Sequence, residues 1–97
     1  MAFNVDTGRL KRIAASCEQQ ANQYDERRRA LANRCSSLQN SWKGASARGF
    51  QELSTEWIGS TQSTVTELRA IAHRLRELAE YYERLDREEQ KKKKKNR

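Results

Sequence analysis

The chain has 97 residues, no proline, 35% hydrophobic and 34% charged residues, so it fits one domain with only a thin core of its own. Small scaffolds of this composition usually need a disulfide, a metal or a partner chain. The net charge of +7 lies in a tail, since six of the 20 basic residues occupy the last seven positions; the balanced body argues against a nucleic-acid-binding fold, which would need a basic face.

The first predicted helix covers about residues 7–41. Asp6 is placed to accept a hydrogen bond from the free N–H groups of the first turn, and Val5 and Leu10 fit a hydrophobic staple. Apolar side chains then recur in steps of four and three, with Arg28 as the exception, which is typical of a helix that packs along another helix. The seam consists of Leu10, Ala14, Cys17, Ala21, Tyr24, Arg28, Leu31, Cys35, Leu38 and Trp42.

A turn is predicted at about residues 42–44. The apolar positions restart beyond Trp42 about a quarter-turn out of phase, and Gly44 can adopt the left-handed conformation that ends a helix. The alternative is one continuous rod with a phase slip, although Gly44 and Gly49 would each cost about 1 kcal/mol in a helix interior.

The second predicted helix covers about residues 45–90. Its seam again steps by four and three: Phe50, Ser54, Trp57, Thr61, Thr64, Leu68, Ile71, Leu75, Leu78, Tyr82 and Leu85. Leu53, Ile58, Val65, Ala72 and Ala79 widen this stripe. The centre of the seam is polar, and Gly59 marks an expected soft spot or bend.

The domain prediction is therefore a helical hairpin over 1–90 followed by a basic tail over 91–97. The tail is a run of like charges, which on its own is extended or frayed, although lysines also favour the negative C-terminal end of a helix. We expect an all-α fold, an antiparallel two-helix hairpin. Its wide stripes predict that two hairpins pair into a four-helix bundle.

Other site types find little support in the residue inventory. Cys17 and Cys35 are separated by roughly 27 Å of helix, too far for an internal disulfide, so buried thiols are expected and a bridge between chains is the minor alternative. A single histidine, His73, provides no metal-ligand set, no catalytic site is expected, and no cofactor is indicated. We expect neither a transmembrane segment nor a cleavable secretory signal.

Trp42, Lys43 and Gly44 form a Trp-X-Gly between two long predicted helices, and Tyr82 and Asp86 form a Tyr-X-X-X-Asp near the C-terminus. In these features, and in length, the chain resembles the Trp-X-Gly (WXG) family of type VII (ESX) secretion substrates. The resemblance covers nearly the whole chain and includes the helix start at Val5 and Asp6. The basic tail beyond the Tyr-X-X-X-Asp motif is a departure from the family pattern.

The resemblance implies folded export from a Gram-positive or actinobacterial cell, with no cleavable signal peptide. It implies a homodimer, or a heterodimer with a related WXG protein, and a membrane-bound secretion ATPase that reads the export motif at Tyr82 and Asp86. Trp42 and Gly44 would form the turn motif and help to engage the machinery. The dimer interface candidates are Leu10, Cys17, Tyr24, Leu31, Phe50 and Trp57.

Two rival functions remain open at the level of sequence. The first is a helical adaptor that pairs with a larger secreted effector and is not itself exported. The second is a nucleic-acid or membrane-surface binder that acts through the lysine tail, whose binding would depend strongly on salt.

Overall fold

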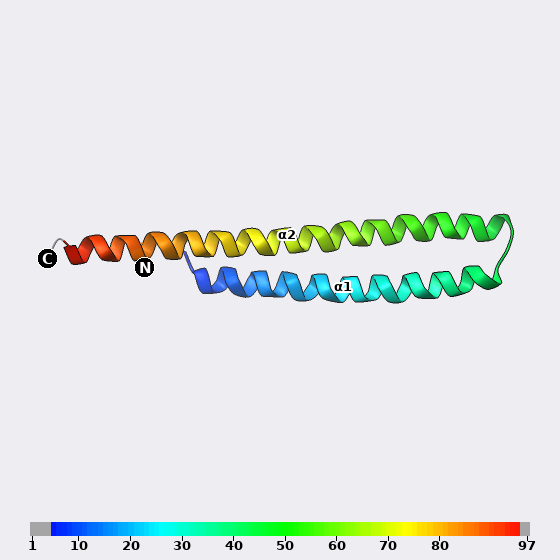
Figure 1. Ribbon diagram of the computed structural model, residues 1–97, viewed down its shortest axis with the longest axis horizontal. Coiled ribbons are helices and arrows are strands. Elements are labelled where there is room, and N and C mark those ends of the chain that lie inside the picture. The colour runs from blue at the N-terminus through cyan, green and yellow to red at the C-terminus, as the bar shows by residue number, and fades with distance from the viewer. Residues whose placement is uncertain (1–4, 96–97) are drawn as a thin grey trace.

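The computed structural model describes residues 5–95, which form two antiparallel helices (Figure 1). Helix α1 is Thr7–Ser41 and helix α2 is Ala45–Lys95. The two helices lie side by side in an elongated molecule of 81 × 15 × 15 Å. The predicted antiparallel hairpin is confirmed, and the alternative of one continuous rod is excluded.

Helix α1 begins as its capping residue predicts. The backbone of Asp6 is extended, and one of its carboxylate oxygens accepts a hydrogen bond of 3.0 Å from the backbone N–H of Arg9. This bond satisfies one of the N–H groups that a first helical turn leaves without an intrahelical acceptor. The chain is thereby fixed as a helix from Thr7 onward.

The turn is made by Trp42, Lys43 and Gly44. Trp42 leaves the helical conformation, and its backbone N–H donates to the carbonyl of Gln39 at 3.4 Å. Gly44 has a φ of 109°, a left-handed value that glycine adopts without steric cost. Its carbonyl accepts a hydrogen bond of 3.2 Å from the backbone N–H of Arg48, in the first turn of α2. The ring centroids of Trp42 and Phe50 lie 5.4 Å apart, so the two rings contact each other across the turn.

Small side chains form the contact between the helices. The buried residues recur mostly at multiples of seven, which keeps them on one line of a helix that packs along its neighbour. They are Thr7, Ala14, Ala21 and Cys35 on α1, and Ala47, Val65, Ala72 and Ala79 on α2. No large side chain is fully buried among the described residues. The hairpin therefore has close helices and a narrow core.

This arrangement corrects the predicted seam of α2. Val65, Ala72 and Ala79, expected only to widen the stripe, face α1, whereas Ile71 and Leu78 remain about half exposed. The period was right, and one line of the predicted seam, which includes Leu68, Leu75 and Tyr82, is half-buried. The other predicted line, which includes Ile71 and Leu78, lies one residue away from the buried line. Small side chains allow the two backbones to approach, so alanine occupies the centre line and the larger neighbours are directed to one side.

Ion pairs between polar side chains of α1 and α2 lie along one side of the helix contact. Lys11 Nζ lies 2.7 Å from Glu83 Oε1, and Arg76 Nε donates to Glu18 Oε1, also at 2.7 Å. Seven residues forward on α1 thus correspond to seven residues back on α2, as expected for an antiparallel register. We call this side, formed by Lys11, Glu18, Arg69, Arg76 and Glu83, the polar edge.

Helix α2 runs unbroken through its polar centre. The expected soft spot at Gly59 does not interrupt the helix, which continues to Lys95, beyond the predicted end near residue 90. Hydroxyl groups in the centre donate to carbonyls one turn earlier, as Ser54 does to Phe50 at 2.8 Å. The lysines at the end are good helix formers and interact favourably with the negative end of the helix.

Candidate functional site

Apolar side chains from both helices gather on the face opposite the polar edge. In a helix with 100° per residue, Leu10 lies about 60° to one side of the seam residue Thr7, whereas Lys11 lies about 40° to the other side. On α2, Leu75 and Arg76 flank Ala72 in the same way. Because ion pairs join the two polar sides, the two apolar sides share the remaining face. We call it the apolar face.

The apolar face is only partly covered by the hairpin itself. Trp57 is 48% exposed, Ile71 49% and Leu78 45%, and Tyr24 on α1 is 42% exposed. Scattered exposed apolar residues are normal, but large contiguous apolar patches mark association sites. The exposed large apolar side chains are Ile13, Tyr24, Leu38, Trp42, Leu53, Trp57, Ile71, Leu78 and Tyr81.

The six interface candidates all remain accessible to some degree. Tyr24 and Trp57 are exposed, and the other four, Leu10, Cys17, Leu31 and Phe50, are half-buried. The four on α1 stand at successive steps of seven along one line. The sequence predicted Ile71 and Leu78 in the seam. Both lines have the same seven-residue spacing, and the signal that distinguishes them is the small size of Ala72 and Ala79, which lets the helices approach.

A groove of about 350 Å³ lies near the turn end of the hairpin and is lined by both helices. Its walls are almost entirely apolar: Leu31, Cys35, Phe50, Leu53, Ser54 and Trp57. The groove shows that the apolar sides of α1 and α2 meet on one face. Its apolar lining suits an apolar group rather than a polar ligand.

The Tyr82–Asp86 pair lies at the opposite, open end of the hairpin. Both residues are on α2, one turn apart and half-buried, near the place where α1 begins. The ring of Tyr82 contacts that of Tyr81 edge to face, with centroids 5.4 Å apart, and Tyr81 is the more exposed of the two. Beyond this pair, α2 extends past the start of α1 (Figure 1).

Ion pairs lower the pKa of three carboxyl groups along the helix contact. The hydrogen bond from Arg76 lowers the pKa of Glu18, and that from Lys11 lowers the pKa of Glu83, with a smaller contribution from Thr7. Asp25 receives two bonds from Arg28, at 3.1 and 2.8 Å, which lower its pKa. Arg28, the exception in the predicted seam, is thus neutralised beside the core.

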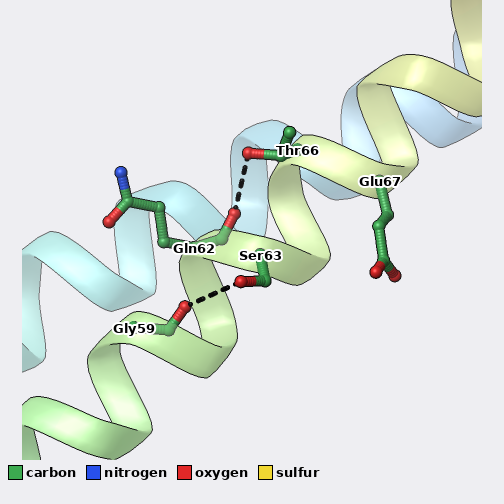
Figure 2. Close-up of a pocket in the computed structure, with 5 residues that line it drawn as sticks. All are labelled: Gly59, Gln62, Ser63, Thr66 and Glu67. Atoms are coloured by element: carbon green, nitrogen blue, oxygen red, sulfur yellow. Dashed lines mark hydrogen bonds between the residues drawn. The ribbon is translucent and has the colours of Figure 1, made fainter.

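A second depression, of about 440 Å³, lies on the outer side of α2 and offers no binding chemistry (Figure 2). Ser63 and Thr66 donate to the carbonyls of Gly59 and Gln62 in their own helix, at 3.2 and 3.1 Å. The Glu67 side chain points away from the other four residues. The two hydroxyl groups are thus bonded to the helix itself, and the Gln62 amide and the Glu67 carboxylate point in different directions, so the polar groups do not converge on a ligand.

Within residues 5–95, no group of three His, Cys, Asp or Glu side chains is arranged to hold a metal ion. Cys17 is half-buried, Cys35 is buried, and both thiols are free. Neither described helix has a segment apolar enough to cross a membrane.

The fold defines a class of protein: a small antiparallel helical hairpin with a partly exposed apolar face. The sequence model of the WXG100 family, described as "Proteins of 100 residues with WXG", matches residues 2–87. The chain belongs to this WXG100 family. Comparison with curated proteins gave no match, and comparison with solved structures gave none. The protein is thus a small WXG-type protein of type VII secretion. The WXG100 family is a non-enzymatic family of helical secretion substrates.

Proposed function

We propose that this chain is an exported substrate of a type VII secretion system that functions as a dimer and presents an export signal on α2. The secretion ATPase at the membrane would bind the helix around Tyr82 and Asp86. The exported species would be the folded dimer, and no cleavable signal peptide would be involved. Membership of the WXG100 family supports the pathway.

The observation that best supports the proposed dimer is the partly exposed apolar face. A two-helix layer buries only small residues in its contact, and large side chains such as Trp57 and Ile71 are left about half in water. Burying a large apolar side chain contributes about 1.5–3 kcal/mol, so pairing two such faces releases substantial free energy. A four-helix bundle is the architecture in which two layers cover each other.

The export role of Tyr82 and Asp86 is supported by their position. They lie one turn apart near the open end, away from the turn and the apolar groove, so a second protein could contact them without opening the hairpin. Each of the two side chains already interacts within the chain, so a test must separate recognition from stability.

Export of Y82A and D86A from cells that contain the secretion ATPase tests the signal. We expect both variants to accumulate in the cell although each remains a folded helical hairpin, as circular dichroism of the purified variants would show. The control is Y81A, which removes the ring contact with Tyr82 from the exposed neighbour and should leave export intact. Normal export of Y82A and D86A would refute the role.

A second candidate function is a partner that pairs with a larger secreted effector and is not itself exported. The same apolar face favours it, because the face accepts any chain with a complementary apolar surface. Fractionation of cells with and without the ATPase distinguishes the two functions. An adaptor stays in the cell in both strains, whereas a substrate leaves only the strain that contains the ATPase.

A further inference from the structure

The C-terminal turn of α2 is a second surface that the dimer and the export motif do not explain. The lysines at 91–95 are all exposed and helical, and they belong to the part of α2 that continues beyond the start of α1. The WXG100 match ends at residue 87, so these lysines lie outside the segment that the family shares. They need an explanation specific to this chain.

The charge is concentrated at one tip of a long molecule. Residues 1–90 carry 14 basic and 13 acidic side chains, whereas residues 91–95 carry five lysines and no acid. The nearest acidic residues, Glu88 and Glu89, are about one turn earlier and can offset at most two of these charges. The tip of an 81 Å rod therefore keeps a clear positive excess.

The arrangement around the helix indicates what this tip can bind. Five consecutive residues at 100° each surround the whole helix, so the segment has no apolar stripe with which to pack against another helix. It has no aromatic residue on which a base could stack, and its cations are lysines, which interact with phosphate as point charges. One turn of helix is also too short to follow a nucleic-acid backbone over many phosphates.

A planar anionic surface suits this geometry better than a second helix or a nucleic acid does. Each lysine within a Debye length of such a surface is attracted without any requirement for orientation and contributes about 1 kcal/mol, so five lysines together can support reversible binding to anionic lipid. We propose that residues 91–95 bind the tip of α2 to the surface of an anionic phospholipid bilayer. The binding is electrostatic and reversible, and the helix does not insert.

The test is sedimentation of the full chain with phosphatidylcholine vesicles that contain or lack phosphatidylglycerol. The wild type should bind the anionic vesicles at least about tenfold more tightly than the neutral ones, and raising the salt to about 0.5 M should abolish the difference. Replacing all five lysines by glutamine should reduce binding about tenfold or more, because it removes the charge and keeps a good helix former.

Two controls make the result specific. Replacing the same five lysines by arginine retains the charge and should retain binding. Replacing five exposed arginines of the body, Arg9, Arg27, Arg34, Arg48 and Arg74, by glutamine removes the same charge elsewhere and should leave vesicle binding largely intact. Circular dichroism of each variant establishes that the hairpin is folded.

Three outcomes would overturn the proposal. The first is equal binding to neutral and anionic vesicles, and the second is undiminished binding by the folded glutamine variant. The third is lysine-dependent binding of a short DNA duplex that is tighter than vesicle binding at the same salt concentration, which would make nucleic acid the partner. None of these measurements depends on export, so they test the lipid proposal separately from the proposed function.

Discussion

Gly44 is the residue at which backbone conformation has the largest consequence. Its φ of 109° belongs to a region that residues with a Cβ rarely adopt, although a Cβ there would meet no atom within 4 Å. The constraint is therefore conformational strain and not crowding. This explains why the turn motif needs glycine specifically, and not merely a small residue, in the position after Lys43.

Replacing Gly44 by alanine should lower the free energy of unfolding by about 1–2 kcal/mol, since an L-residue is strained at this φ. Gly59 offers the matched control, because it is helical, has open space around it and should gain about 0.5–1 kcal/mol as alanine. Urea unfolding of both variants measures the difference. Equal effects of the two substitutions would contradict the account of the turn.

The carboxylates of Glu18, Asp25 and Glu83 predict a dependence of stability on pH. Their ordinary pKa values are 4.5, 3.8 and 4.5, and each is lower in the folded chain. The unfolded chain therefore takes up protons first as pH falls. The contribution of these groups to stability is complete above the ordinary values and is lost as pH falls through the lowered ones.

Thermal unfolding followed between pH 7 and about pH 3 should show a falling Tm below about pH 4.5. The double variant E18Q/E83Q should be less stable at neutral pH and should lose less on acidification, because its groups no longer titrate. Glu52, an exposed residue of α2, supplies the control as E52Q. An acid dependence that is the same in all three proteins would argue against the polar edge.

At the scale of the helices, the sequence predicted most of the hairpin and only part of its contact. Helix starts, the turn and the heptad period follow from local chemistry at Asp6, Gly44 and the apolar spacing. The line of α2 that faces α1 does not, because steps of four and three fit two adjacent lines equally well. The close packing of the two helices determines which line is buried: the small side chain of Ala72 fits in the contact, whereas Ile71 remains about half exposed.

The candidate site was likewise predicted where it depends on local sequence and missed where it depends on packing. An exposed apolar surface was predicted because the apolar stripes are wider than one helix contact can cover. Which residues of α2 lie on that surface depends on how the two helices pack, and the sequence did not predict it. The Trp-X-Gly corner and the Tyr82–Asp86 pair could be recognised as motifs because they depend on residue identity and spacing. Their positions at opposite ends of the hairpin follow from the antiparallel register.

The narrow contact predicts that enlarging a seam alanine separates the helices. Ala72 is 1% exposed, so A72L should destabilise the hairpin by about 1–3 kcal/mol through overpacking. Ala70, an exposed residue two positions earlier on α2, provides the control, and A70L should change stability little. Urea unfolding is the measurement, and a neutral A72L would show that Ala72 does not face α1 in solution.

At the scale of the whole molecule, the proposed functional features are distributed along a rod. The turn lies at one end of the hairpin and the C-terminal part of α2 at the other (Figure 1). The apolar groove is near the turn, the proposed export motif and the lysine turn are near the open end, and the apolar face lies between them. The core of the hairpin is narrow because most large side chains are directed to this face. The proposed association follows from this geometry, since the hairpin without a partner leaves those side chains in water.

The mass of the purified chain in solution tests this claim most directly. The account predicts a stable, helical species of twice the 11.3 kDa chain mass, and predicts that placing a charge on the apolar face, as in W57E or I71E, dissociates it or unfolds it. If the chain pairs only with a related protein, it should be poorly folded when alone. A cooperatively folded monomer at high concentration, unaffected by W57E and I71E, would contradict the account.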